Sequence, residues 1–323
     1  PGGLEAGQLT VREHAADVPS VRSARSAIAA LVVGRSTGDG RLAVLALFLP
    51  PGLLLFTLFV VLPIGEAAWY SGFNWNGFGR PTNWIGLDNY RFVLQTRAFW
   101  LALRNNGLII VVSLGVQLPL ALALALVLAE RFRGAVALRM LFFLPYILAE
   151  IATGLIFSFV YDGDYGLVAS IWRLFGAEAP HLLASTQTAM LAVLIVIVWK
   201  YFGFHMMLFI AALQSMDRNL VDAARIDGAT RPQVLRYVVI PLLYPTIRLS
   251  VFFAIIGSLQ LFDLVMPLTR GGPADSSNTM VSFLYNNGIS RMRVGYGSAI
   301  GVILFVICVI FAVTYKRWFM RDE

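Results

Sequence analysis

Apolar residues gather in six long runs along this chain, and polar segments separate the runs. About 20 mostly apolar residues are enough for a helix to cross a bilayer. The runs that reach this length cover residues 42–64, 108–129, 140–160, 189–213, 249–268 and 295–315. The pattern therefore predicts an all-α polytopic membrane protein with six transmembrane helices. Prolines predict a kink at Pro50-Pro51 in the first run and a bend at Pro145 in the third.

The polar segment 214–241 lies where a hairpin connection would need only a few residues. Helix-forming residues predict a helix from Arg218 to Ile226, and Gly228 follows it as a residue that readily takes the left-handed cap. A second amphipathic piece follows the Gly-Ala-Thr-Arg-Pro break. We expect Pro241 and Pro245 to stop this piece and restart the fifth span. The segment thus predicts a folded helix-turn-helix at the membrane surface, suited to gripping a soluble partner.

Composition supports the membrane assignment and sets an orientation. The chain is 58% hydrophobic and 13% charged, whereas soluble domains carry about 25% charged residues. Sixteen Lys and Arg residues fall in the terminal tails and the loops after the second and fourth runs, against eight in the other loops. The net charge of +7 is therefore interpreted as positive-inside topology and not as nucleic-acid binding. This places both termini and the 214–241 segment in the cytoplasm.

The expected domains are a cytoplasmic tail over residues 1–41, a transmembrane domain over 42–315 and a cytoplasmic tail over 316–323. The first tail begins at Pro1 without Met, which leaves open whether all of it is native.

Several kinds of chemistry are missing from the sequence. A lone Cys308 excludes an internal disulfide, and His14, His181 and His205 lack the spacing of metal ligands. Paired catalytic Asp motifs, a zinc-protease motif and a Ser/His pairing are absent, so we expect neither an enzyme nor a metal site. Without a Gly-x-x-x-x-Gly-Lys-Ser/Thr motif, the chain cannot hydrolyse ATP by that route.

The 214–241 segment resembles the coupling motif of binding-protein-dependent ATP-binding cassette (ABC) importers. The family pattern is Glu-Ala-Ala, three residues, Gly, nine residues and Ile-x-Leu-Pro. This chain has Asp222-Ala223-Ala224, then Gly228, then Val238-Val239-Ile240-Pro241 at the same spacing, with Asp for Glu and Val and Ile for Ile and Leu. Further similarities at 74–77, 103–106, 257–263 and 268–273 extend the resemblance over about 42–315. They indicate the sugar-type branch that includes the larger membrane subunit of the maltose importer.

The resemblance implies a permease subunit in a bacterial or archaeal plasma or inner membrane. Its implied partners are a second permease subunit, an ATPase dimer that carries the ATP and Mg, an extracytoplasmic sugar-binding protein and the sugar itself. The ATPase would dock on the small side chains of Ala223 and Ala224, with polar contacts from Asp222, Arg225 and Asp227 and with Gly228 and Pro241 bounding the motif.

Polar side chains inside the apolar runs are the candidate substrate site. A charge at mid-bilayer costs about 2.5–3.5 kcal/mol, so it needs a partner or a wet cavity. Matching to maltose-type permeases implies a site that contains Lys200, Tyr201, Phe204, Gly257, Gln260 and Leu261. Polarity alone adds His205 and Asp263. The alternative is structural: Lys200 pairs with Asp263 or Glu150 and holds the bundle together.

Two other functions compete with sugar import. A stand-alone secondary transporter would need neither an ATPase nor the long coupling loop. An ABC importer of a phosphorylated polyol such as glycerol phosphate would call for several cations in the pore, where Lys200 alone is available.

Overall fold

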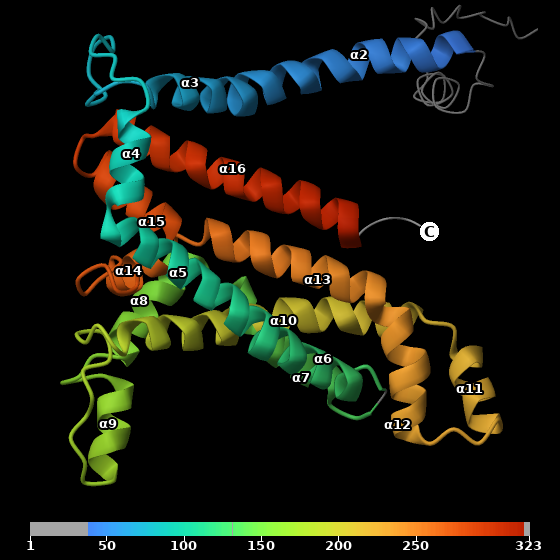
Figure 1. The fold of residues 1–323 in the computed structure, drawn as a ribbon. Coiled ribbons are helices and arrows are strands. Elements are labelled where there is room, and N and C mark those ends of the chain that lie inside the picture. Colours follow the sequence, from blue (N-terminus) through green and yellow to red (C-terminus); the bar gives the residue numbers. More distant parts are fainter. Residues whose placement is uncertain (1–37, 131, 320–323) are drawn as a thin grey trace, which may run out of the picture. The chain divides into compact units, whose positions relative to one another are not determined.

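The computed structural model describes residues 38–130 and 132–319, and helices dominate them (Figure 1). No β-strand occurs in these two stretches, where an isolated antiparallel bridge joins Phe73 and Trp84. The elements, with η marking a π-helical turn, are α2 (Gly38–Phe56), η1 (Thr57–Val61), α3 (Leu62–Tyr70), α4 (Asp88–Gln95), α5 (Arg97–Val112), η2 (Ser113–Gln117), α6 (Leu118–Leu128), α7 (Ala135–Ile147), α8 (Glu150–Val160), α9 (Leu167–Leu174), α10 (Ala189–Ser215), α11 (Arg218–Ile226), α12 (Arg231–Val234), η3 (Leu235–Val239), α13 (Ile240–Gln260), α14 (Val265–Thr269), α15 (Met280–Leu284), η4 (Tyr285–Ile289) and α16 (Val294–Phe319).

The chain forms two compact units, residues 1–63 and residues 64–323. The described part of the first unit is α2, η1 and the start of α3. Here α2 runs through Pro50 and Pro51 as one helix, so the predicted kink is not accompanied by a break. The expected N-terminal tail lies outside the described residues, apart from 38–41.

Within residues 38–130 and 132–319, five helices are long and apolar enough to cross a membrane, and a bent pair supplies up to one more. The five are Leu47–Tyr70, Arg97–Leu128, Ala189–Ser215, Arg231–Gln260 and Val294–Phe319. The bent pair is α7 with α8, which meet at 95°. The predicted all-α fold with six transmembrane segments is therefore confirmed, although two of the segments differ from the prediction.

Three of the prolines inside the spans are accommodated by π-turns. Three π-turns end two residues before a proline: η1 before Pro63, η2 before Pro119 and η3 before Pro241. Proline cannot donate to the carbonyl four residues back, and its ring collides with that carbonyl. An inserted π-turn shifts the register and relieves the collision. The prediction that Pro241 and Pro245 stop and restart a helix was therefore wrong, because one helix runs from Arg231 to Gln260.

The third span breaks where no proline stands. Pro145 lies inside α7, and the chain becomes extended at Leu148 and Ala149 before α8 begins. The sequence predicted a bend at Pro145 in this span, and the structure places the break three residues after that proline. The last carbonyls of a helix need partners from elsewhere. Here the Lys200 Nζ donates to the carbonyl oxygens of Pro145, at 3.3 Å, and Leu148, at 2.6 Å.

The fifth span ends at Gln260, eight residues before the predicted end at 268. Leu261 is extended, and its carbonyl accepts a hydrogen bond of 2.7 Å from the Thr279 hydroxyl. The short helix α14 follows and packs against α8. The breaks after Ile147 and Gln260 interrupt two spans within the second unit.

Helix α10 is the hub of the second unit, since it packs against α6, α7 and α13 (Figure 1). Ala121 and Ala125 of α6 are fully buried in a cluster with Phe202, Met206 and Phe209 of α10. Small residues allow helix backbones to approach closely in a membrane. The close packing fixes α10, and α10 carries much of the site described next.

Candidate functional site

The coupling segment, residues 214–241, folds locally as the sequence predicts over its first half. Helix α11 covers Arg218–Ile226, and the Asp217 side chain caps it by accepting from the Asn219 N–H at 3.0 Å. Gly228 has a φ of +82°, the left-handed conformation expected after a helix end. The next turn is held by Thr230, whose N–H donates to Gln233 Oε1 at 2.7 Å.

The surface of α11 is open. None of its residues is buried, and Ile226 and Leu220 expose 86% and 47% of their surface. Asp222 and Arg225 form an exposed ion pair at 3.6 Å, an arrangement that adds little stability. Asp222, Ala223, Arg225, Asp227 and Gly228 are exposed and Ala224 is half-buried, whereas Pro241 belongs to the span helix α13.

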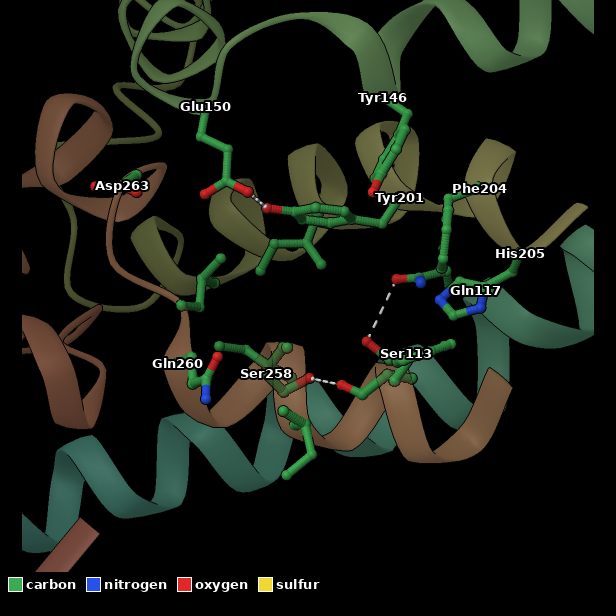
Figure 2. A pocket seen from close by; sticks show the side chains of 17 residues that line it. Ser113, Gln117, Tyr146, Glu150, Tyr201, Phe204, His205, Ser258, Gln260 and Asp263 are labelled. Atoms are coloured by element: carbon green, nitrogen blue, oxygen red, sulfur yellow. Dashed lines mark hydrogen bonds between the residues drawn. The ribbon is translucent and has the colours of Figure 1, made fainter. Parts of the chain in front are cut away.

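A cavity of about 520 Å³ lies among the spans of the second unit (Figure 2). Five segments line it: the end of α5 with η2, the break between α7 and α8, α10, α13 and the turn after α13. The lining residues are Ile109, Ser113, Gln117, Tyr146, Glu150, Ile197, Tyr201, Phe204, His205, Phe253, Ala254, Ile256, Gly257, Ser258, Gln260, Leu261 and Asp263. The breaks of the two interrupted spans therefore lie at the same cavity.

Most of the predicted substrate residues meet in this cavity. The seven that line it are Tyr201, Phe204, His205, Gly257, Gln260, Leu261 and Asp263. The eighth, Lys200, does not line it: it is 99% buried and faces the carbonyl oxygens at the end of α7. In residues 38–130 and 132–319 the side-chain ion pair found is that of Asp222 with Arg225, so Lys200 pairs with neither Asp263 nor Glu150.

The sequence reasoning missed lining residues from the second, third and fifth spans. Ser113, Gln117, Tyr146 and Ser258 were not proposed, and Glu150 was proposed only as a partner for Lys200. A buried amide in an apolar run, such as Gln117, was a usable signal, because polar groups at membrane depth face protein or a wet cavity. No comparable signal marks Tyr146, because its place depends on the break three residues after Pro145.

Several polar side chains of the cavity form hydrogen-bonded pairs, and one buried polar atom has no hydrogen-bond partner. The Tyr201 hydroxyl donates to Glu150 Oε1 at 2.7 Å, and Ser113 donates to Gln117 Oε1 at 3.3 Å (Figure 2). The Nδ1 atom of His205 is buried without a hydrogen-bond partner. A buried polar atom without a partner is costly, so it signals a site that another group completes.

Aromatic rings form one wall of the cavity. Tyr146 stacks on Phe204 with ring centroids 4.9 Å apart and planes 24° apart, and Phe253 meets Phe204 edge-on at 6.0 Å. Apolar faces beside donors and acceptors suit a ligand that has both ring faces and hydroxyl groups.

Buried asparagines hold the break after α13 in place. The Asn106 side chain donates to the Ser258 carbonyl and accepts from the Met280 N–H at 2.8 Å. Asn105 donates to the carbonyls of Ser276 and Asn278, both at 2.9 Å. These bonds tie α5 to the loop that follows α14 and so fix the wall that contains Ser258.

No group of His, Cys, Asp and Glu side chains able to hold a metal ion occurs in the part of the chain that the structure describes. The lining offers hydrogen-bonding groups and aromatic faces.

Comparisons with known proteins give the family. Residues 117–319 match the model of the binding-protein-dependent transport system inner membrane component. Among curated proteins, the sulfoquinovosyl glycerol transport system permease protein SmoG of Agrobacterium fabrum is 31% identical over 281 residues, which are 87% of this chain and 91% of that protein. The diacetylchitobiose uptake system permease protein NgcF of Streptomyces coelicolor is 32% identical over 82% of this chain and 79% of its own length. The trehalose/maltose transport system permease protein MalF of Thermococcus litoralis is 31% identical over 85% and 94%.

A solved structure shares the fold. A chain of a bacterial ABC transporter involved in the import of the acidic polysaccharide alginate superposes with a TM-score of 0.77 at 21% identity, over 88% of this chain and 97% of that one. The match to the family model covers more than half of this chain and includes both the coupling segment and most of the cavity. The chain therefore belongs to the family of binding-protein-dependent transport system inner membrane components, and it is a membrane permease subunit of an ABC transporter and not an enzyme.

Proposed function

We propose that this chain is a permease subunit of a carbohydrate importer and that the cavity holds the sugar on its way across the membrane. The observation that carries the proposal is the cavity itself, where an aromatic wall faces Gln117, Glu150, His205, Gln260 and other hydrogen-bonding groups. The relatives named for sulfoquinovosyl glycerol, diacetylchitobiose and trehalose/maltose transport support the substrate class.

The proposal includes the assembly that drives transport. An extracytoplasmic binding protein delivers the sugar, a second permease subunit completes the pathway, and a separate ATPase dimer docks on α11. A related solved importer is in complex with a pentasaccharide-bound periplasmic protein, which supports the first partner. The exposed apolar side chains of Leu220 and Ile226 support the docking of a partner on α11.

In this mechanism, a movement of α11 is transmitted to the fifth span because that span is one continuous helix. Only residues 227–230 separate α11 from the helix that runs from Arg231 to Gln260. A push on α11 by the ATPase would therefore be carried by α12, η3 and α13 to Gln260, which lines the cavity. The expected domains and the cytoplasmic placement of both termini belong to the same proposal.

Gly257 offers a sharp test of the sugar site. A Cβ atom at Gly257 would meet no heavy atom within 4 Å, so the side chain of Gly257→Leu begins in open space at the cavity wall. We expect uptake of maltose, trehalose or diacetylchitobiose, whichever the wild-type importer carries with its binding protein, to fall about tenfold or more. Uptake into proteoliposomes that contain the complete importer is the measurement.

The matched control is Gly107→Leu. Gly107 is a glycine of α5 with equally open space, and it does not line the cavity. Unchanged uptake in Gly257→Leu, with an intact complex, would show that the sugar does not pass through this cavity. Uptake by the permease without any ATPase subunit would instead favour a stand-alone secondary transporter.

A further inference from the structure

We infer that Glu150 and Asp263 make the cavity a charge filter that admits neutral saccharides and rejects acidic ones. The inference rests on the proposed sugar site and adds which saccharides the site accepts. Glu150 and Asp263 would then select saccharides by charge, in addition to the recognition of their hydroxyl groups.

The charges that face the cavity have one sign. Glu150 and Asp263 are the acidic residues of the lining, and neither Lys nor Arg is among the lining residues. The nearest candidate cation, Lys200, is turned away and donates to the carbonyls of Pro145 and Leu148. An acidic sugar in the cavity would meet two carboxylates and no guanidinium or ammonium group among these residues.

The two carboxylates come from the two interrupted spans, and each follows the end of a helix. Glu150 begins α8 directly after the break in the third span, and Asp263 lies three residues beyond the end of α13. Tyr201 donates to one oxygen of Glu150, which leaves the other oxygen able to accept from a sugar hydroxyl. Asp263 is exposed at the cavity and engages no basic side chain within the described residues.

His205 indicates independently that the cavity is built for a ligand. Its side chain is 97% buried, it lines the cavity, and its Nδ1 atom has no hydrogen-bond partner. A hydroxyl group of a neutral sugar can complete this atom as donor or acceptor. The same cavity thus offers unfilled hydrogen-bonding capacity beside two acidic side chains that form no ion pair within the described residues.

Electrostatics gives the direction and rough size of the filter. Like charges a few ångströms apart repel strongly where water is partly excluded, and an anion that loses its hydration needs a cationic partner. We therefore expect a uronate to bind about tenfold or more weakly than its neutral counterpart. The solved relative that imports the acidic polysaccharide alginate shares the fold at 21% identity, so we place the discrimination in side chains and not in the fold.

The test is equilibrium binding to the complete importer in lipid nanodiscs without binding protein. The probes are a neutral glucose trisaccharide and the same trisaccharide with a terminal uronate. The measurement is made at pH 8, where an ordinary histidine, with a pKa of about 6.5, is neutral. Wild type is compared with Glu150→Gln, Asp263→Asn and the double variant. Glu178→Gln, which removes an exposed carboxylate outside the lining, is the control.

We expect the wild type and the control to favour the neutral sugar at least about tenfold, and the double variant to bring the ratio close to one by binding the uronate more tightly. Equal binding of both sugars by the wild type, or an unchanged ratio in the double variant, would overturn the filter. A different result marks failure of the sugar site itself: neither sugar binds, or Gly257→Leu leaves binding of the neutral sugar unchanged.

Discussion

The cavity and the coupling segment are built in opposite ways. The first half of the coupling segment is a local structure, where Asp217, Gly228 and the pair of Thr230 and Gln233 set the helix ends within a few residues. The cavity collects side chains from residue 109 to residue 263, and bonds between distant segments hold its walls. Local structure follows from local residues, so α11 is readable in the sequence, whereas the cavity exists only after the spans have packed.

The comparison also separates stability from function. Helix α11 of the coupling segment is exposed and contributes little to packing, so substitutions there should weaken the interaction with a partner subunit more than they lower the free energy of unfolding. Substitutions that remove the buried hydrogen bonds around the cavity should lower both the free energy of unfolding and sugar binding. Five substitutions test this contrast, in decreasing order of the expected loss of stability.

Asn106→Ala should have the largest effect on stability. It leaves the Ser258 carbonyl and the Met280 N–H without their buried partner, and each such loss costs about 1–3 kcal/mol. We expect the free energy of unfolding in detergent to fall by about 3 kcal/mol, with loss of sugar binding. Asn74→Ala, at an exposed asparagine, is the control and should change stability little. Equal stability of the two variants would mean that the hydrogen bonds of Asn106 do not stabilise the wall of the cavity.

Lys200→Met, compared with Tyr201→Phe, should distinguish the roles of two adjacent residues of α10. It removes the donor to the carbonyls of Pro145 and Leu148, so we expect a loss of about 2 kcal/mol and a looser break in the third span. Tyr201→Phe loses one hydrogen bond to Glu150 and should cost about 1 kcal/mol while weakening sugar affinity. Thermal unfolding and equilibrium sugar binding of both variants are the measurements. If Lys200→Met weakened sugar affinity more than Tyr201→Phe did, Lys200 would belong to the site after all.

Gly228→Ala tests the coupling segment and should lower the free energy of unfolding less than Asn106→Ala or Lys200→Met does. Its Cβ has open space, but its φ of +82° strains any side chain, by about 1 kcal/mol. Gly134→Ala is the matched control, because Gly134 has a φ of +92° and open space at the start of α7. Both variants should lose similar stability, while Gly228→Ala alone should reduce the ATPase activity that a sugar-loaded binding protein stimulates. Equal ATPase loss in both would remove the special role of α11.

Asp222→Asn should have the smallest effect on stability. Its ion pair with Arg225 is about 60% exposed on both sides, so the change in the free energy of unfolding should stay within about 0.5 kcal/mol. The proposed docking predicts a weaker association with the ATPase subunits nonetheless, measurable as a higher subunit concentration for half-maximal assembly. Normal assembly would remove Asp222 from the docking surface and leave the other exposed residues of α11.

Most of the fold and part of the site could be predicted from the sequence. Long apolar runs gave the membrane class, because the bilayer requires a fixed length of helix. Seven of the eight proposed substrate residues line one cavity: five came from the resemblance in motif, and His205 and Asp263 came from their polarity within apolar runs. The helix boundary predicted at Pro241 was wrong, because a π-turn lets the helix pass this proline.

The chain by itself determined what depends on length, periodicity and nearby residues: the apolar spans, the helix of the coupling segment and its glycine cap. The tertiary structure alone decided where two spans break, because Lys200 and Thr279 reach across to the carbonyls that each break frees. It also decided which polar residue faces the cavity and which supports it. Lys200 and Tyr201 are neighbours in sequence, yet successive residues of a helix point about 100° apart. Packing around α10 therefore turned the lysine to the backbone and the tyrosine to Glu150.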